Sequence, residues 1–279
     1  MSAPPHERRA AASRSAGIRR IAFFDVDETL ITVKSMLDFA QQAPHSLGED
    51  KTAQPHEGLH RGGTDLAALR RRGASRAEMN RVYYRRYAGV ALARLQKAGR
   101  DWYHAYRTRP DGYITAGLAA LARHRRAGHT IVLVSGSARP LLTPLAEDLG
   151  ADRILCTEQL ADAQGILTGE VARPMIGEAK AEAVTEVMAQ LRVPTTDCFA
   201  YADHASDLDM LRAVGNPVVV GPDPVLARYA RASDWPVLPA DAGPRSARTQ
   251  HHDAHGHDGP EIIALTSGQP TAPRDQARQ

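Results

Sequence analysis

Three short apolar runs in this chain end next to acidic or hydroxyl side chains, and this pattern constrains the fold most. The runs and the polar residues that follow them are 21–24 with Asp25, 131–134 with Ser135, and 199–201 with Asp203. A short apolar run between polar segments is typical of a strand that is covered on both faces of a parallel sheet. Ligands of such sheets bind at the carboxyl ends of the strands. We therefore expect these polar side chains to form one site.

The rest of the pattern predicts an α/β fold with a Rossmann-like parallel sheet core, formed by residues 18–33 and 112–239. Residues 34–111 read as a mainly helical insertion between the first and second polar signatures. Ser75 and Glu78 have capping-box spacing, and separate helices are expected around Leu92 and around Trp102. We expect residues 1–17 and the His-rich tail 240–279 to be disordered.

Composition leaves several classes of function open but favours none of them. The 35 Lys and Arg residues barely exceed the 32 Asp and Glu residues, so the pI of about 9.0 supports nucleic-acid binding only as a minor alternative. Cys156 and Cys198 have no spacing typical of zinc sites or disulfides. No apolar stretch approaches the ~20 residues that cross a bilayer. We expect a soluble, cytoplasmic protein without a membrane partner.

Asp25 and Asp27 form the first signature, and their spacing suits phosphoryl transfer. Side chains at i and i+2 of an extended segment point to the same side, so both carboxylates would face one site. Asp25 can attack phosphorus as a covalent nucleophile. Asp27 can protonate the leaving oxygen and later accept a proton from water.

The second and third signatures supply groups that bind phosphate. The Ser135 hydroxyl can donate to a phosphoryl oxygen, and Gly136 allows backbone N–H groups to approach closely. Lys180 can neutralise charge that a metal leaves over. It lies at the start of a predicted helix, where the helix dipole disfavours a cation, so a functional reason for it is plausible.

Together these motifs resemble the haloacid dehalogenase superfamily, and within it subfamily IB, the phosphoserine phosphatase-like enzymes. The motifs are Asp25-Val26-Asp27-Glu28-Thr29, Ser135 with Gly136, Lys180, and Asp203 with Asp207. The position of the helical insertion matches the cap of that subfamily. The resemblance covers residues 20–238 and implies that 34–111 form this cap.

The resemblance also implies a role for each acidic residue and a magnesium cofactor. It makes Asp25 the nucleophile and Asp27 the general acid and base. Mg²⁺ would be bound by Asp25, by the backbone carbonyl of Val26 and by Asp203, with Asp207 orienting a metal-bound water. Asp27 is the less favoured alternative to Val26 among these ligands.

Two positions depart from the family pattern. Lys34 stands where phosphoserine phosphatases carry a glutamate for the substrate ammonium, which favours an anionic or hydroxyl-bearing substrate group, unless Lys34 points to solvent. His204 either titrates near neutral pH or has a structural role, and we favour the second. The tyrosines of the insertion either line a substrate pocket or pack, and packing is favoured. They are Tyr83, Tyr84 and Tyr87.

The predicted function is a Mg²⁺-dependent phosphatase that hydrolyses a small phosphomonoester through an aspartyl-phosphate, with a phosphorylated metabolite as its partner. A phosphotransferase on the same fold is the first alternative, and a basic nucleic-acid-binding protein is the second. A metal site in the tail is a minor hypothesis. Its residues would be His251, His252, Asp253, His255 and His257.

Overall fold

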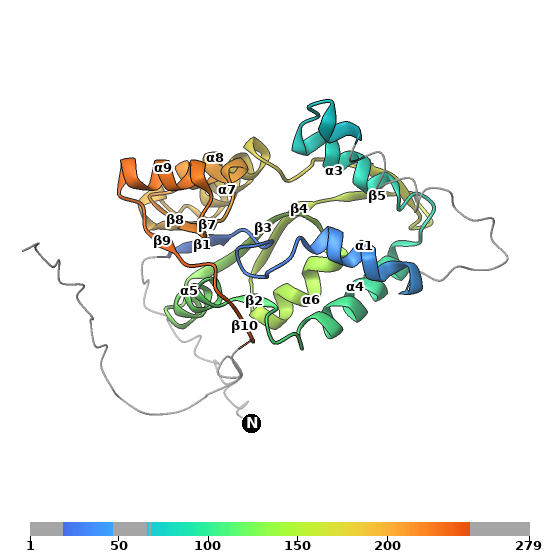
Figure 1. Cartoon of the computed structure of the whole chain (residues 1–279), viewed down its shortest axis with the longest axis horizontal. Coiled ribbons are helices and arrows are strands. Elements are labelled where there is room, and N and C mark those ends of the chain that lie inside the picture. Colours follow the sequence, from blue (N-terminus) through green and yellow to red (C-terminus); the bar gives the residue numbers. More distant parts are fainter. Residues whose placement is uncertain (1–18, 47–65, 67, 246–279) are drawn as a thin grey trace, which may run out of the picture. The chain divides into compact units, whose positions relative to one another are not determined.

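The computed structural model describes residues 19–46, 66 and 68–245 of the chain (Figure 1). The predicted disordered N-terminus and the histidines of the tail lie outside these residues, so both predictions stay untested. Among the described helices, none has the length and apolar character that a bilayer span requires. Cys156 and Cys198 are both buried free thiols.

A six-stranded parallel sheet forms the core, in the strand order β4-β3-β1-β7-β8-β9. Its strands are β1 (Ile21–Phe24), β3 (Thr130–Ala138), β4 (Arg153–Thr157), β7 (Cys198–Ala202), β8 (Asn216–Val220) and β9 (Val237–Leu238). The predicted α/β fold with a parallel sheet core is confirmed. One boundary was wrong, because β3 continues through Ser135 instead of ending before it.

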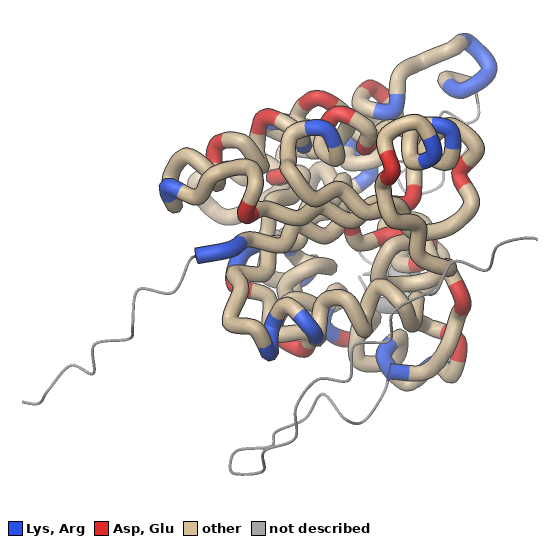
Figure 2. The backbone as a smooth tube through the Cα atoms, turned by 90° about the vertical axis from the view of Figure 1, so that its left-hand side faces the viewer, with Lys and Arg blue, Asp and Glu red and all other residues tan. Residues whose placement is uncertain are grey.

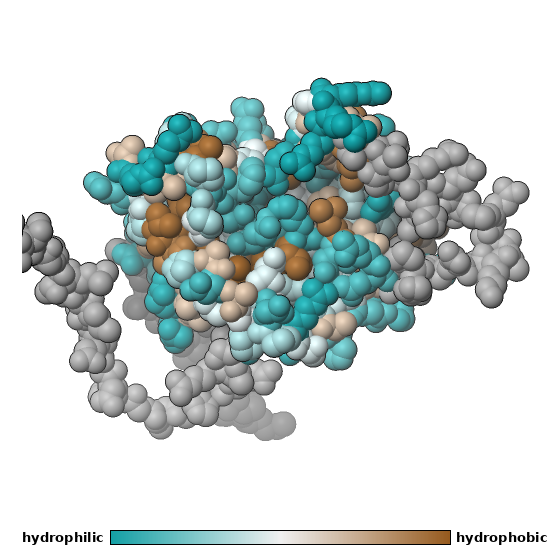
Figure 3. All heavy atoms as spheres, viewed as in Figure 1, coloured by the Kyte–Doolittle hydropathy of each residue, from teal (hydrophilic) through white to brown (hydrophobic). Residues whose placement is uncertain are grey.

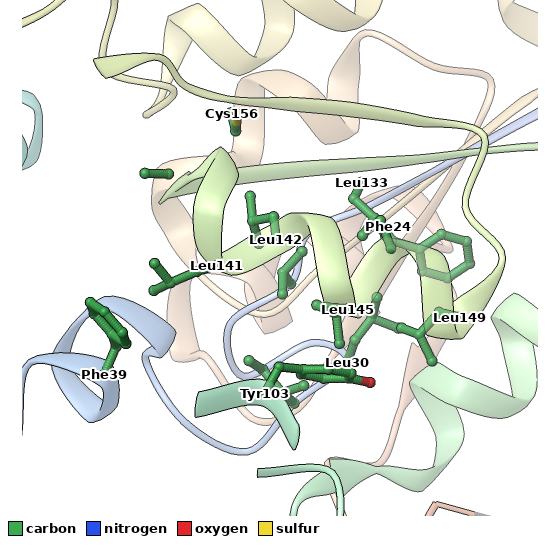
Figure 4. Close-up of a cluster of buried hydrophobic side chains, with 14 of the residues drawn as sticks. Phe24, Leu30, Phe39, Tyr103, Leu133, Leu141, Leu142, Leu145, Leu149 and Cys156 are labelled. Atoms are coloured by element: carbon green, nitrogen blue, oxygen red, sulfur yellow. The ribbon is translucent and has the colours of Figure 1, made fainter. Parts of the chain in front are cut away.

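Successive residues of β1 point to opposite faces of the sheet and divide the interior into two clusters. Ala22 and Phe24 belong to one cluster, and Ile21 and Phe23 belong to the other. Figure 4 shows the first cluster, in which Phe24 lies near the leucines of helix α6 (Arg139–Leu149). All four residues of β1 are fully buried, which explains the continuous apolar run.

Helices cover both faces of the sheet. They are α5 (Thr115–Arg126), α6 (Arg139–Leu149), α7 (Glu178–Leu191), α8 (Leu208–Arg212) and α9 (Pro224–Ser233), with the 3-10 turns η1 (Thr195–Asp197) and η2 (Ala205–Asp207). The lysine-bearing helix α7 packs in the second cluster through Val184, Val187 and Met188. The 3-10 turn η2, which precedes α8, is capped by the His204 side chain, which accepts from the Ser206 N–H.

The insertion between the first and second motifs is helical, as predicted, and we call its helices α1, α3 and α4 the cap. Their bounds are α1 (Ser35–Ser46), α3 (Arg76–Arg85) and α4 (Leu92–Tyr106). Ser75 and Glu78 form the predicted capping box at the start of α3. The two helices expected around Leu92 and Trp102 are one continuous helix, which runs through Gly99 between them.

The cap lies directly on the core through α4 and α6, which run in close contact. A Cβ atom at Gly99 of α4 would lie only 2.2 Å from the carbonyl oxygen of Pro140, so this approach requires glycine. Asp38 ties α1 to α4, since it accepts from the Trp102 indole at 2.8 Å and from Arg109 at 3.0 Å. These contacts fix the cap helices against one another and against the sheet.

Two short pairs of strands complete the described chain. β5 (Gln159–Ala161) and β6 (Leu167–Val171) pair antiparallel as a hairpin. β2 (Tyr113–Ile114) pairs with β10 (Ala242–Gly243). The tail predicted to be disordered from residue 240 is therefore ordered up to 245, where the Arg245 guanidinium donates to the Asp148 carbonyl at 2.8 Å.

Charges and apolar groups are spread over the described surface. Figure 2 shows basic and acidic residues interspersed along the same helices. The face in Figure 3 is mainly hydrophilic, with separate apolar patches. Large apolar side chains with substantial exposure are few among the described residues: Leu37, Leu160 and Val237.

Candidate active site

Strand register brings the first, second and fourth motifs to one edge of the sheet. Phe24 of β1 is level with Leu133 of β3 and with Tyr201 of β7. Residues just beyond these positions, which include Asp25, Ser135 and Asp203, therefore follow three neighbouring strands at the same end. Adjacent strands lie only ~4.8 Å apart, so their side chains share one site.

Three carboxylates meet at this edge. Asp25, Asp203 and Asp207 each offer one oxygen within 4.8 Å of the others, and Asp25 and Asp207 are buried. The Thr29 hydroxyl lies between two of them, 3.1 Å from Asp203 Oδ1 and 3.3 Å from Asp25 Oδ2. It can donate to one of them at a time, and it holds both on the same side of the loop.

Lys180 is the cation that balances part of this charge. Its Nζ donates to Asp25 Oδ1 at 2.6 Å and to Asp207 Oδ2 at 2.8 Å, and its side chain is 4% exposed. Burial opposes the charge of Lys180, but Asp207 and Asp25 outweigh it and raise its pKa above the usual value. The ammonium is thus held charged, and the third of its protons is left for a further acceptor.

One ammonium does not compensate three carboxylates. Burial raises the pKa of Asp25 to about 8; Lys180 opposes this shift, whereas Asp207 and Asp203 add to it. Burial likewise raises the pKa of Asp203, and Asp207 adds to that rise. The cluster therefore offers oxygen ligands, and its negative charge is only partly compensated when the carboxylates are ionised. Such an environment suits a hard divalent cation.

Asp27 lies beside this cluster with partners of its own. Its Oδ1 accepts from the backbone N–H of Ser35 at 3.1 Å, at the start of α1. Burial raises the pKa of Asp27 to about 7, and the nearby Asp25 adds to the rise, while the Ser35 hydrogen bonds oppose it. A carboxyl group with such a pKa can both give and take a proton near neutral pH.

The hydrogen bonds in the loop that follows Asp25 bear on the predicted carbonyl ligand of the cation. The Val26 carbonyl accepts from the N–H groups of Thr29, Leu30 and Ile31, at 3.3, 2.9 and 3.1 Å. Its lone pairs are therefore directed into the turn. Within the described residues the carbonyl of Asp27 accepts no hydrogen bond, so it is the freer carbonyl of this segment.

Ser135 is buried and oriented by its own strand. Its Oγ accepts from the Ser137 N–H at 3.1 Å, which leaves the hydroxyl proton free to donate elsewhere. A Cβ atom at Gly136 would lie 2.5 Å from Ile176 Cδ1, so the Ile176 side chain packs closely against this glycine. The arrangement can thus hold a small anionic group between hydroxyl, ammonium and carboxylates.

Comparison with known proteins agrees with this geometry. Residues 22–212, more than half of the chain, match the family of haloacid dehalogenase-like hydrolases. The chain belongs to this family. This hydrolase is 32% identical over 225 residues to the inhibition of morphological differentiation protein of Streptomyces azureus. The match covers 79% of this chain and 78% of that protein.

Relatives of this hydrolase in Mycobacterium tuberculosis are named as phosphatases. A probable phosphatase is 32% identical over 240 residues, which span 84% of this chain and 79% of that protein. A phosphoserine phosphatase is 30% identical over 217 residues, which span 77% of this chain and 47% of that protein. The predicted family and enzyme class, a phosphoric monoester hydrolase, are confirmed.

Solved structures share the fold of this hydrolase. A protein of unknown function from Bordetella pertussis has a TM-score of 0.67 at 23% identity, and the match covers 80% of this chain and 99% of that one. A substrate-bound phosphoserine phosphatase has a TM-score of 0.57 at 17% identity, covering 81% and 95%. At these identities the likeness supports the Rossmann-like fold alone.

The two departures from the family pattern, Lys34 and His204, are close enough for Lys34 to contribute to lowering the pKa of His204. Lys34 forms an ion pair with Glu28, and both side chains are nearly half exposed. The Nδ1 of His204 lies 2.8 Å from Arg76 Nη1 and accepts from the Ser206 N–H at 2.9 Å. Burial and Arg76 lower the pKa of His204, so a neutral, structural role is the one that its contacts support.

Several residues of the site were missed in the sequence. Ser35 orients Asp27, and its hydroxyl contacts that of Ser137. Asn80 is 4% exposed and donates to the Gly136 carbonyl at 2.9 Å. A polar residue on the apolar side of a predicted helix was the available signal for Asn80. The tyrosines beside it are buried, as the packing interpretation predicted.

Proposed function

We propose that this hydrolase is a Mg²⁺-dependent phosphatase that cleaves a small phosphomonoester through an aspartyl-phosphate. The observation that carries the proposal is the contact of Lys180 with Asp25 inside a cluster of three carboxylates, with Asp27 two residues away. Nucleophile, cation site and proton donor thus lie on one loop and its nearest neighbours. Phosphoryl transfer needs little more than these parts.

The donor set fits magnesium. Mg²⁺ prefers oxygen ligands and keeps several waters, and the three carboxylates offer one oxygen each within 4.8 Å. In this proposal Asp25 and Asp203 hold the ion together with the Asp27 carbonyl, and Asp207 orients a water ligand. When bound, the ion would keep Asp25 ionised and neutralise charge on the phosphoryl oxygens.

The residues of the chain account for each bond change. An Asp25 carboxylate oxygen attacks phosphorus, the bond from phosphorus to the ester oxygen breaks, and Asp27 donates its proton to the leaving oxygen. Asp27 then takes a proton from water, whose oxygen attacks phosphorus and releases phosphate from Asp25. The Ser135 hydroxyl and the Lys180 ammonium donate to phosphoryl oxygens in both steps.

The cap supports a small substrate. Helices α1 and α3 contact the loops of the site through Ser35 and Asn80, so a large polymer would have to displace them. The phosphoserine phosphatase among the relatives makes phosphorylated amino acids reasonable first candidates. The ion pair between Lys34 and Glu28 is partly exposed to solvent and lies in the segment that carries Asp25 and Asp27, so we propose that the substrate headgroup contacts this pair.

Release of phosphate from a panel of small phosphomonoesters tests the proposal directly. The wild type should require Mg²⁺ and lose activity with a chelator, and Asp25→Asn should lower kcat by at least about 10³-fold. Equal phosphate release by wild type and Asp25→Asn would refute the mechanism. Transfer to an added alcohol, seen as a new phosphate ester, would favour the phosphotransferase alternative.

A further inference from the structure

Two cap residues hold a single backbone carbonyl in the second motif. Asn80 Nδ2 and the Tyr84 hydroxyl donate to the Gly136 carbonyl oxygen at 2.9 and 3.2 Å. Both residues lie on α3, four positions apart, and therefore on the same face of the helix. A carbonyl oxygen has two lone pairs, so these two bonds use both of them.

We propose that Asn80 and Tyr84 are positioning residues that orient the Ser135 hydroxyl for phosphate through the peptide between Gly136 and Ser137. This inference rests on the phosphatase function proposed above. It makes the phosphate site complete only while α3 contacts the core. Neither cap residue needs to touch the substrate.

The peptide plane carries the effect from the cap to the hydroxyl. The Gly136 carbonyl and the Ser137 N–H belong to one planar unit, and in a trans peptide they point in opposite directions. Fixing the carbonyl toward α3 therefore directs the N–H away from α3, where it donates to Ser135 Oγ at 3.1 Å. Because that bond occupies the oxygen as an acceptor, the hydroxyl proton is directed elsewhere.

Glycine makes such a restraint necessary. Gly136 has no side chain that would limit the rotation of its peptide. Donors from another element can supply the restraint. The two donors of α3 supply it.

A second contact of Asn80 fixes the direction of its amide. Thr157 Oγ1 accepts from the Met175 N–H at 3.0 Å, so its own proton is available for Asn80 Oδ1, 3.3 Å away. The amide oxygen thus faces Thr157 and the amide nitrogen faces Gly136. Met175 lies in the segment before α7, so Asn80 joins the cap both to β3, which carries Ser135, and to the segment that leads into the Lys180 helix.

Variants that keep shape but remove a donor test the proposal. Asn80→Asp replaces the amide donor with an acceptor, and Tyr84→Phe removes only the hydroxyl. The matched control is Tyr87→Phe, which also deletes a buried tyrosine hydroxyl next to α3, but one that bonds Tyr83 instead of Gly136. Inhibition by inorganic phosphate and kcat/KM are measured for each, beside the thermal midpoint.

We expect Tyr84→Phe to weaken phosphate inhibition and to lower kcat/KM by about fivefold, which corresponds to the loss of one neutral hydrogen bond. Asn80→Asp should lower kcat/KM by about tenfold or more. Tyr87→Phe should keep phosphate inhibition and kcat/KM within about twofold of the wild type, even if its thermal midpoint falls by as many degrees as that of Tyr84→Phe. Wild-type values for Tyr84→Phe, or the same losses in Tyr87→Phe, would overturn the proposal and leave α3 with a packing role only.

A double-mutant cycle with Ser135→Ala separates positioning from general damage. If Asn80 and Tyr84 act through the Ser135 hydroxyl, Tyr84→Phe should change phosphate inhibition by less than about twofold once that hydroxyl is gone. An undiminished effect in the Ser135→Ala background would overturn the inference. Failure of the wild type to release phosphate would instead refute the proposed function, whereas an active wild type with unaffected Tyr84→Phe refutes this inference alone.

Discussion

Replacing Asp203 with asparagine should make the metal-free protein more stable while it abolishes activity. Asp203 lies within 4.8 Å of Asp25 and Asp207, and Lys180 contacts those two but not Asp203. Two unit charges at 4.8 Å repel by about 3.5 kcal/mol at an effective dielectric constant near 20. Asp203 therefore has two such repulsions, which hydrogen bonds with Asp25 and with the Thr29 hydroxyl offset only in part, because its pKa is still raised.

Proton uptake limits how much of this repulsion the folded protein bears. Keeping one carboxyl group protonated at about pH 7.5 costs about 5 kcal/mol, because its pKa in the unfolded chain is near 3.9. The repulsion therefore cannot destabilise the folded protein by more than this amount, since protonation would relieve it. Lys180 offsets part of the remaining negative charge. We expect Asp203→Asn to raise the free energy of unfolding by about 1–3 kcal/mol, or the thermal midpoint by about 2–12 °C.

The assay is thermal unfolding in chelator and in Mg²⁺. The wild type should gain stability with Mg²⁺, by about 2.7 kcal/mol at a hundred times its Kd, and Asp203→Asn should gain little. Asp209→Asn is the matched control, because that carboxylate lies on α8, is exposed and is outside the cluster. A metal-free Asp203→Asn protein less stable than wild type, or one that Mg²⁺ stabilises equally, would refute the reasoning.

Three further predictions concern charge and packing. Lys180→Met removes the cation that contacts the buried carboxylates of Asp25 and Asp207, so urea unfolding at neutral pH should show a loss of about 3–5 kcal/mol, and a smaller loss at pH 5, where Asp25 is protonated. The pKa values of Asp25 and Asp27 are raised to about 8 and about 7, so their contribution to stability is present at low pH and is lost as pH rises through those values. The thermal midpoint in chelator should therefore fall between pH 5.5 and 8.5, and a midpoint that rises over this range would contradict the shifts. Gly99→Ala places a methyl group against the Pro140 carbonyl and should cost about 1–3 kcal/mol in urea unfolding, with an unchanged midpoint arguing against the contact of α4 with α6.

Residues that follow buried strands were predictable because sequence marks strand ends locally. The apolar run at 21–24 and the acids after it indicate both the strand and the site, and register then brings the neighbouring strand ends together. Lys180 was identifiable by its position, since a cation at a helix start is unfavourable without a nearby anion. In the structure that anion is supplied by Asp25 and Asp207.

Contacts between the cap and the core were not predictable in the same way. Asn80 and the Gly136 carbonyl are 56 positions apart, and no local pattern pairs them. The turn after Asp25 is equally hidden, because the choice between the Val26 and Asp27 carbonyls depends on three N–H groups that converge on the first. Such choices follow from tertiary packing, which periodicity does not encode.

The charge balance of the site makes cation binding and phosphate binding interdependent. When all are ionised, three carboxylates and one ammonium leave a net charge of about −2 around Asp25, which would repel a phosphate dianion by several kcal/mol at these distances. A bound divalent cation cancels that charge, so it must increase the affinity for phosphate, and by linkage phosphate must increase the affinity for the cation by the same factor. Positioning by the cap adds to this coupling without carrying charge, because Asn80 and Tyr84 are neutral donors. Salt and pH should therefore act mainly on the carboxylate cluster, whereas Tyr84→Phe, which adds no charge, should shift phosphate affinity by a similar factor at every pH at which the cluster binds its cation.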